Sequence, residues 1–300
     1  MKSPYDIEQT SFAVCLLLSK RARSYDIIHT QDPLAARILD KCNRLGLFKP
    51  RVLLAHGTEE TEEFLARLSL VQHLAPHHMG KLNPETNTSA RCFFVPNFVD
   101  TQRFFPGANS ELRKKLGISE SAFVVLTTAA VKRHHKRIDY LIDEFVRFEA
   151  KADKESHLVI IGASTDETTE LVDGATAACP GRIHFLLDQE HEEIPSILGL
   201  GDLFVLCSLK EMMPIALLEA ISSGLPSLVS KHPVVNWMIG PGGESIAMEE
   251  KRALEIALHK WSDPTLRHTA GEQARAHAIE LFSKKNVLDK LVDIYRAILL

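Results

Sequence analysis

A short apolar segment, a polar loop and an almost wholly apolar helix follow one another between residues 202 and 226, and this succession constrains the fold more than any other feature of the chain. Leu203–Cys207 has the length and composition of a buried strand. A helix is expected over Pro214–Ser223, because proline suits a first helical turn and Gly224 followed by Pro226 is a typical helix end. A buried strand joined through a polar loop to a buried helix predicts a ligand-facing βα turn of a parallel sheet.

Two glutamates, separated by seven residues, occupy this βα unit. Glu211 lies in the loop ahead of the predicted helix, and Glu219 lies inside the helix among apolar neighbours. A helix that is apolar nearly all round is buried, and a buried carboxylate is costly unless another group bonds it. The unit therefore predicts polar groups that serve a ligand.

The alternation of strands and helices extends along most of the chain and predicts an α/β fold with parallel sheets covered on both faces. The predicted strands are Asp26–His29, Arg51–Ala55, Phe123–Thr128, Leu158–Ile161, Ile183–Leu187, Leu203–Cys207 and Ser227–Ser230. The predicted helices are Ile7–Arg23, Pro33–Leu45, Ile138–Phe148, Thr168–Ala178, Ile194–Leu198, Pro214–Ser223 and a helical tail from Pro264 to Leu300 with a break near Ser283. Gly240–Gly243 is expected in a loop beyond the last strand.

Composition narrows the functional classes. The chain has 300 residues, enough for two domains, and its net charge of −4 does not favour a nucleic-acid surface. Five cysteines are scattered without a CxxC pair, which indicates reduced thiols in the cytosol. The sequence has no apolar run of the roughly 20 residues that span a bilayer, and its first residues are unlike a signal peptide, so we expect a cytoplasmic protein.

Histidines suggest metal sites at first sight, but their spacing does not support them. His191-Glu192-Glu193 has no second histidine at the spacing of a zinc protease. His77-His78 and His134-His135 are adjacent pairs, which are poorly placed to share one metal ion. We therefore expect no metal site.

Four segments, taken in order and at their spacing, resemble one enzyme family. They are Asp26–His29; Val95–Asp100 with Arg103, Phe104 and Pro106; Lys136–Leu141; and the Glu211 to Glu219 block. Together they are similar to the retaining, nucleotide-sugar-dependent glycosyltransferases of family four, also called group 1 glycosyl transferases. The resemblance runs from about residue 25 to residue 295 and implies the GT-B fold, in which two Rossmann-like domains carry parallel sheets.

The resemblance also implies a domain organisation. Residues 1–105 would form an N-terminal, acceptor-side domain, with the C-terminal helix 284–300 packing back on it. Residues 106–283 would form the domain that binds the nucleotide-sugar donor. Only some 25 residues precede Asp26, where family members have about two more βα units. We therefore expect an incomplete N-terminal domain, which either a protein partner completes or a truncated gene product explains.

The implied reaction is transfer of a hexose from a nucleotide-diphosphate sugar to a hydroxyl acceptor with retention of anomeric configuration. The departing diphosphate needs its negative charge stabilised, which a lysine and a helix N-terminus supply without a metal or another cofactor. The acceptor is a glycan, a lipid-linked molecule or a small molecule, and no nucleic acid takes part. A membrane surface, bound peripherally, is a further possible partner that we leave open.

Residue roles follow from the match to the family's motifs. Lys136 matches the phosphate-binding lysine, Glu211 the glutamate that contacts the donor sugar, and Glu219 the glutamate that holds the ribose hydroxyls. The eight residues from Glu211 to Glu219 would rise about 12 Å as a helix, comparable with the reach from sugar to ribose. His56 matches the N-domain histidine that faces the donor sugar, so the expected catalytic group is His56, Lys136 and Glu211.

Other residues complete the expected site. The family's diphosphate-binding Gly-Arg is replaced here by Ala129-Ala130-Val131, and Lys132 or Arg133 is expected to substitute. Pro214 lacks an N–H, which leaves the amides of Ile215 and Ala216 for the donor. His29 and Asp32 are expected on the acceptor side.

These departures from the family pattern leave two alternative functions open. In the first, the chain is a non-catalytic nucleotide-sugar-binding or partner subunit. In the second, which has less support, it is a nucleotide-sugar epimerase of the same fold.

Overall fold

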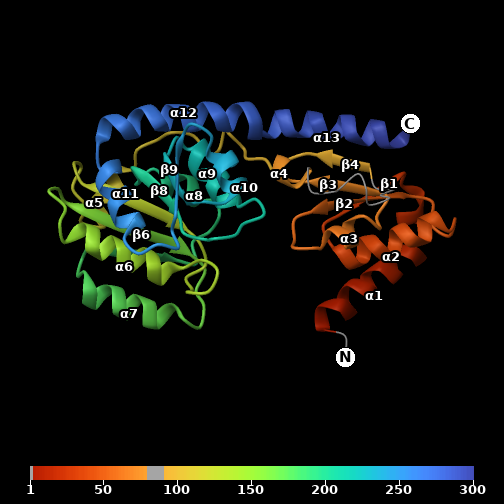
Figure 1. Ribbon diagram of the computed structural model, residues 1–300, viewed down its shortest axis with the longest axis horizontal. Helices are drawn as coiled ribbons and strands as arrows, with labels where there is room; N and C mark the ends of the chain where they lie inside the picture. Colours follow the sequence, from red (N-terminus) through yellow and green to blue (C-terminus); the bar gives the residue numbers. More distant parts are fainter. Residues whose placement is uncertain (1–2, 80–90) are drawn as a thin grey trace. The chain divides into compact units, whose positions relative to one another are not determined.

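The computed structural model describes residues 3–79 and 91–300 (Figure 1). The chain divides into two compact units. Unit 1 comprises Met1–Asn97 with Lys285–Leu300, and unit 2 comprises Phe98–Lys284. Each unit has its own parallel sheet.

Unit 1 is built on a four-stranded parallel sheet in the sequential order β1-β2-β3-β4. The strands are β1 (Ile27–Thr30), β2 (Arg51–His56), β3 (Leu70–His73) and β4 (Arg91–Phe94). The helices between them are α2 (Pro33–Arg44), α3 (Glu62–Leu65) and α4 (Pro76–Met79). Within the described residues β1 pairs with β2 alone, so β1 is an edge of the sheet.

Both faces of this sheet are covered. α1 (Pro4–Leu18) and α2 pack on one face around Ala13, Leu39 and Val52. α13 (Lys284–Leu299) covers the other face, where Ile298 packs against Leu53 and Leu70. Burial of these apolar side chains at about 25 cal/mol per Å² is the main force that holds the helices on the sheet.

The first helix is shorter than predicted. Ser3 and Asp6 form a capping box at its start. The helix ends at Leu18, where Ser19 has an extended backbone and its side chain accepts a hydrogen bond from the Ala22 amide. A 3₁₀-helix, η1 (Ala22–Ser24), follows, so the single helix predicted over Ile7–Arg23 is wrong over its last five residues, 19–23. A serine that bonds its own backbone competes with helix continuation.

Unit 2 is built on a six-stranded parallel sheet in the order β10-β9-β8-β5-β6-β7. The strands are β5 (Phe123–Thr128), β6 (Ser156–Gly162), β7 (Ile183–Leu187), β8 (Leu203–Leu206), β9 (Ser227–Ser230) and β10 (Gly243–Ile246). The helices are α5 (Ser110–Lys115), α6 (Ile138–Glu149), α7 (Thr168–Ala178), α8 (Ile194–Leu198), α9 (Ile215–Ser222), α10 (Pro233–Ile239), α11 (Ala253–Trp261) and α12 (Pro264–Phe282). This is the doubly wound order, in which the chain reverses its direction of winding between β5 and β8.

Apolar side chains from the central strands fill the core of unit 2. Val125, Leu158 and Val205 are fully buried and pack against Phe145 of α6 and Leu258 of α11. Near-continuous apolar runs are typical of parallel strands that are buried on both faces. The strands predicted here are therefore found at or within a few residues of their expected positions.

Several elements escaped the sequence prediction, and β3, α10 and β10 are among them. β3 is only four residues long and carries Gln72 and His73, and α10 and β10 fall where a loop was expected. Gly243 is the first residue of β10. A Cβ at this position would lie 2.0 Å from the Ser227 carbonyl oxygen of β9, so the strand needs glycine here. This glycine is a close approach between neighbouring backbones, not a sign of a loop.

Candidate functional site

The two loops at the winding reversal of unit 2 carry the residues with the strongest chemical character. One loop, residues 129–137, follows β5, and the other, residues 207–214, follows β8. Because β5 and β8 are neighbouring parallel strands, their carboxyl ends open at one edge of the sheet. The crevice at such a reversal is the usual ligand site of doubly wound sheets.

A charged pair joins these loops. Lys136 Nζ lies 2.6 Å from Glu211 Oε1, and both side chains are largely buried. A second bond runs in parallel, between His135 Nε2 and the Lys210 carbonyl oxygen at 3.1 Å. Two of the predicted catalytic residues, 75 positions apart in sequence, are thus brought into direct contact.

The loop that carries Lys136 is tightly coiled. His135 and Arg137, its neighbours on both sides, have φ values of 69° and 53°, a region that non-glycine residues seldom adopt. The Arg137 amide donates to the Arg133 carbonyl, and the Arg137 guanidinium donates to the Met248 carbonyl and stacks 4.0 Å over the Tyr140 ring. Such unusual backbone geometry is characteristic of functional loops whose side chains are held in place.

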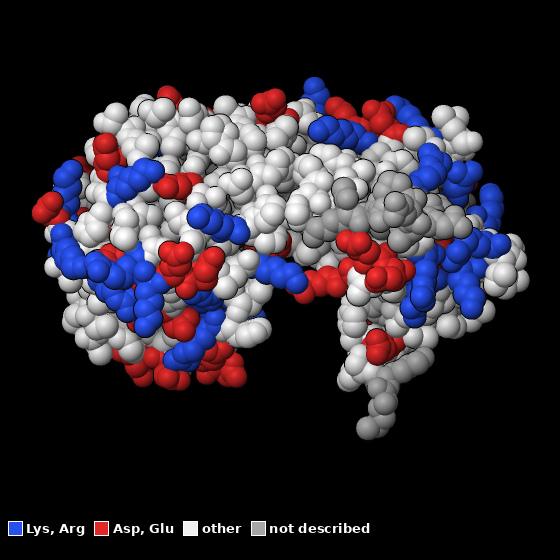
Figure 2. All heavy atoms as spheres, in the orientation of Figure 1, with Lys and Arg blue, Asp and Glu red and all other residues white. Residues whose placement is uncertain are grey.

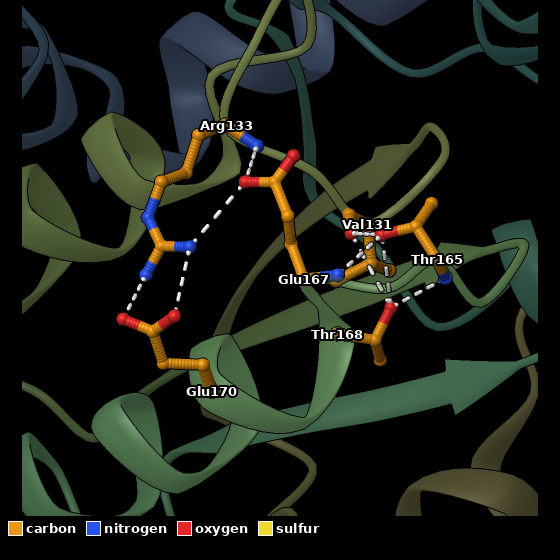
Figure 3. A network of polar contacts seen from close by, with 6 residues as sticks. All are labelled: Val131, Arg133, Thr165, Glu167, Thr168 and Glu170. Atoms are coloured by element: carbon orange, nitrogen blue, oxygen red, sulfur yellow. Dashed lines mark hydrogen bonds and ion pairs between the residues drawn. The ribbon is translucent and has the colours of Figure 1, made fainter.

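Figure 3 shows a second set of bonds that holds this loop against the loop after β6. Thr165 and Thr168 donate their hydroxyl protons to the Val131 carbonyl. Glu167 accepts from the Arg133 amide at 3.1 Å, and the Arg133 guanidinium bonds both Glu167 and Glu170. The network fixes the backbone from Val131 to Arg133 ahead of Lys136.

This network bears on the two substitutes expected for the family's diphosphate-binding arginine. The charge of Arg133 is already paired with Glu167 and Glu170, and these carboxylates raise its pKa against the opposing effect of burial. Lys132 is half-buried and makes no ion pair within the part of the chain that the structure describes. Of the two, Lys132 has the side chain better placed to meet a further anion.

The helix after β8 starts one residue later than predicted. Pro214 is its N-cap and Ile215 its first residue. No side chain caps this end, so the backbone N–H groups of the first turn, which include Ile215 and Ala216, have no capping partner. Uncapped N–H groups and the helix dipole favour an anion at this position.

Glu219 lies within α9 and is 6% exposed. Its Oε1 is 2.9 Å from Nε2 of His191, a residue of the segment between β7 and α8. Burial raises the pKa of Glu219, while the hydrogen bond from His191 and the charges of His191 and Arg103 act in the opposite direction. The buried carboxylate thus pairs with a histidine whose own side chain is exposed.

His191 and Arg103 form a group with Glu219 that the sequence prediction missed as a site. The Arg103 guanidinium donates to the His191 carbonyl at 2.6 Å, and the Phe104 ring lies 5.9 Å from the His191 ring. The sequence offers only a weak signal, because His191 is 28 positions from Glu219 and joins it through the fold alone. Arg103 and Phe104 were noted as parts of the family pattern, without a role.

Unit 1 carries three of the predicted site residues, His29, Asp32 and His56, and His56 belongs to a cluster of histidines. His56, at the end of β2, is buried, with its Nδ1 3.2 Å from Nδ1 of His73 and its ring 5.8 Å from that of His78. Burial, together with the positive charge of His56 and His78, lowers the pKa of His73 to about 4. His73 is therefore neutral near neutral pH.

His29 and Asp32 both precede α2, His29 within β1 and Asp32 at the start of the helix. His29 Nδ1 bonds the Tyr295 hydroxyl at 2.7 Å, and burial lowers the pKa of His29. Asp32 is the N-cap residue of α2, but Gln9 Oε1 accepts from the Leu34 and Ala35 amides. The first amides of α2 are therefore already bonded by Gln9.

Two kinds of feature are absent from the described residues, 3–79 and 91–300. They contain no cluster of three or more histidine, cysteine or acidic side chains that could hold a metal ion. They also contain no helix that is both long and apolar enough to cross a bilayer.

Comparison with known proteins gives the family. Residues 108–277, more than half of the chain, match the family model of the glycosyl transferases group 1. N-acetyl-alpha-D-glucosaminyl L-malate synthase of Bacillus anthracis is 25% identical over 251 residues, which cover 82% of this chain and 62% of that protein. UDP-Gal:alpha-D-GlcNAc-diphosphoundecaprenol alpha-1,3-galactosyltransferase of Escherichia coli is 27% identical over 67% of this chain and 53% of its own length. The chain thus spans a little over half of these relatives.

Solved structures of the same architecture agree with this match. Sucrose-phosphate synthase from Thermosynechococcus elongatus superposes with a TM-score of 0.83, covering 99% of this chain and 79% of its own at 16% identity. Anabaena HepE in complex with UDP gives a TM-score of 0.79, covering 96% and 82% at 16% identity. The predicted α/β GT-B fold with parallel sheets is confirmed, and the chain belongs to the group 1 glycosyl transferases.

Proposed function

We propose that this protein transfers a hexose from a nucleotide-diphosphate sugar to a hydroxyl acceptor with retention of anomeric configuration. The observation that carries the proposal is the Lys136–Glu211 contact of 2.6 Å at the winding reversal of the donor-type sheet. It places a cation, a carboxylate and the uncapped start of α9 on neighbouring loops.

Lys136 and the first turn of α9 are assigned to the leaving diphosphate. An ammonium group has three protons, so Lys136 can keep Glu211 as a partner while it donates to a phosphate oxygen. The amides of Ile215 and Ala216 add donors that need no reorganisation, and Lys132 adds a further positive charge. These groups stabilise negative charge as the bond from sugar to diphosphate breaks.

Glu211 is assigned to the donor sugar. Its carboxylate has oxygen lone pairs that Lys136 does not occupy, and these can accept from sugar hydroxyls. The lysine also orients the carboxylate before the sugar arrives. We assign no protein nucleophile.

Glu219 is assigned to the ribose. A vicinal diol presents two O–H donors, which suit one carboxylate. Glu219 is buried and bonds His191 through one carboxylate oxygen. Its other lone pairs can accept hydrogen bonds from a ligand. Binding of the diol offsets part of the desolvation cost that raises its pKa.

Relatives support a nucleotide-sugar donor and leave the acceptor open. The Escherichia coli relative is named for a UDP-galactose donor, and HepE was solved with UDP and with UDP-glucose. The named acceptors differ, malate in one relative and a diphosphoundecaprenol-linked sugar in another. We therefore propose a hydroxyl acceptor without further definition.

Unit 1 is assigned to the acceptor side, with His56 as the residue that contacts the donor sugar. A neutral imidazole can accept from a sugar hydroxyl, and His56 Nδ1 lies 3.2 Å from His73 Nδ1. His29 and Asp32 are assigned to the acceptor. No metal or further cofactor takes part in this proposal.

The test is turnover of a panel of nucleotide sugars, measured as hydrolysis and as transfer to simple alcohols, alongside calorimetric binding of each donor. Wild-type protein should bind and turn over at least one donor, and the product anomer, resolved by proton NMR, should match the donor. Lys136→Ala and Glu211→Ala should lose turnover, whereas Lys251→Ala, an exposed lysine of the same unit, should not. Binding without turnover would support the non-catalytic subunit instead, and an inverted product would overturn retention.

A further inference from the structure

Glu219, the carboxylate proposed for the ribose, is held by a residue from another part of unit 2. The side chain lies within α9 and is buried, and Nε2 of His191 is 2.9 Å from its Oε1. An ionised carboxylate only accepts hydrogen bonds, so the proton of this bond sits on His191 Nε2. The bond occupies Oε1 and leaves Oε2 able to accept from a ligand.

His191 is itself held in place, although it lies in the turn before α8 and not in a helix or strand. Its backbone carbonyl accepts from the Arg103 guanidinium at 2.6 Å, and its ring lies 5.9 Å from the ring of Phe104. The Arg103 guanidinium also lies 5.5 Å from the centre of the Phe104 ring. The His191 side chain is 58% exposed, so these contacts, and not deep burial, restrict its orientation.

The segment that carries these two contact residues is anchored on α9. The Phe104 carbonyl accepts from the Ser222 hydroxyl and from the Arg275 guanidinium, both at 2.7 Å. Ser222 is fully buried in α9, three residues after Glu219. The contacts therefore form a closed path that leaves α9 at Ser222 and returns to it at Glu219 through His191. His191 is thus fixed relative to the helix that carries the carboxylate.

The bond from His191 matters because a glutamate carboxylate turns easily. The last torsion of a glutamate side chain has a broad preference, so burial alone does not fix the plane of its two oxygens. A ribose presents its 2′- and 3′-hydroxyls side by side, and they bond a carboxylate well only when its free lone pairs face them. A hydrogen bond to Oε1 restricts the rotation before the nucleotide arrives, which lowers the ordering cost of binding.

Surface charge cannot make a comparable selection. Figure 2 shows lysine and arginine interspersed with aspartate and glutamate over unit 2 on the face that it draws. A ribonucleoside diphosphate and its deoxy analogue also carry the same charge. Selection between them has to come from a group that contacts the hydroxyls, and a site built to bond a hydroxyl discriminates strongly against a ligand that lacks it.

We propose that His191 is a positioning residue, which turns Glu219 toward the ribose diol and so makes the site select a ribonucleoside diphosphate over its 2′-deoxy and 3′-deoxy analogues. The inference rests on the proposed assignment of Glu219 to the ribose. It goes further, because it makes the discrimination depend on a histidine that acts through Glu219. Arg103 supports the same geometry through its bond to the His191 carbonyl.

The experiment is calorimetric titration of the full chain with uridine, guanosine and adenosine diphosphates, and with the 2′-deoxy and 3′-deoxy analogues of the one that binds most tightly. Wild-type protein should bind the ribonucleotide about tenfold or more tighter than either analogue. His191→Ala should weaken the ribonucleotide alone and bring the ratio to about threefold or less, since Glu219 keeps its place in α9 but loses its alignment. His191→Gln, whose amide N–H can donate to Oε1, should keep most of the wild-type ratio.

The matched control is His268→Ala, because His268 is an exposed histidine of unit 2 that also lies near a glutamate, with its Nε2 3.6 Å from Glu272 Oε1. This variant should keep the wild-type affinity and ratio, and circular dichroism should show that every variant folds. Three results in His191→Ala would overturn the inference: a wild-type ratio, an equal loss for all three nucleotides, or tighter binding of the ribonucleotide. The last would mean that His191 competes with the ribose for Glu219.

Glu219→Ala separates this inference from the proposed function. If Glu219→Ala loses the ratio while His191→Ala keeps it, the donor site stands and the role of His191 falls. If the wild type binds none of the nucleotides, or if Glu219→Ala binds the ribonucleotide as well as the wild type does, the donor assignment falls and the inference falls with it.

Discussion

Lys136 Nζ and Glu211 Oε1 lie 2.6 Å apart and join the loops that follow the two central strands of unit 2, β5 and β8. The contact gives a defined starting state for donor binding. In the proposed reaction, a phosphate that reaches Lys136 meets a cation that is already positioned, and a sugar that reaches Glu211 meets a carboxylate that Lys136 already orients.

Replacing Lys136 should therefore lower turnover in a protein that still folds. We expect Lys136→Ala to lower turnover at least a hundredfold, because one donor to developing negative charge is worth about 3 kcal/mol. The free energy of unfolding should fall by about 1–3 kcal/mol, because the largely buried Glu211 carboxylate loses its partner. Steady-state kinetics and urea unfolding measure the two effects. Lys154→Ala, an exposed lysine of unit 2, is the control, and comparable turnover in the two variants would refute the role of Lys136.

Glu219→Gln should weaken donor binding without lowering the stability of the protein. The pKa of Glu219 is raised by burial, so the folded protein holds the proton more tightly than the unfolded chain, and the ionised carboxylate costs stability at neutral pH. The neutral amide should leave the protein equally or more stable at pH 7 while donor affinity falls about tenfold or more. Thermal unfolding at pH 7 and pH 5 checks this. The wild type should gain relative to the variant as pH falls, and a variant less stable than wild type at pH 7 would contradict the account.

Stability should also depend on the histidine cluster of unit 1. The pKa of His73 is lowered to about 4, from 6.5, so the unfolded chain takes up the proton first as pH falls. The folded state should lose about 2 kcal/mol between pH 6.5 and pH 4.5, after allowance for partial solvation. Urea unfolding over this range measures the loss. In His73→Gln the loss should shrink, and an unchanged pH dependence in that variant would exclude the cluster as its source.

The bonds drawn in Figure 3 should contribute unequally to the free energy of unfolding. Thr168→Val removes a buried hydroxyl that bonds the Val131 carbonyl and should cost about 1 kcal/mol of unfolding free energy. Glu170→Ala breaks an exposed ion pair with Arg133 and should cost about 0.5 kcal/mol or less. Chemical unfolding compares them, and a larger cost for Glu170→Ala would show that the ion pair, and not the threonine, anchors the loop.

How far the sequence could predict this molecule depends on how local each signal is. The strand Leu203–Leu206 and helix Ile215–Ser222 were found because their apolar runs are continuous. β10 was missed because Gly243 serves a close approach to Ser227, which a sequence alone presents as a loop residue. The end of α1 was missed because Ser19 bonds local backbone instead of continuing the helix.

The site shows the same division. Glu211 and Glu219 stand in one short segment with a family-like spacing, so the sequence predicted both. Their partners come from elsewhere in unit 2: Lys136 was placed by motif alone, and His191 was overlooked because only the fold brings it to Glu219. The pairing of Arg133 with Glu167 and Glu170 could not be inferred, because charges on separate loops meet only once the sheet is formed.

The most direct test of the central claim is calorimetric titration of nucleoside diphosphates into wild-type protein and Glu219→Ala, with uridine diphosphate first and the guanosine, adenosine and thymidine diphosphates after it. At least one should bind the wild type with a measurable Kd, and the same ligand should bind Glu219→Ala at least tenfold more weakly while the variant unfolds cooperatively. Equal affinity in the two proteins, or no binding of any of the four, would contradict the assignment of this site to a nucleotide-sugar donor.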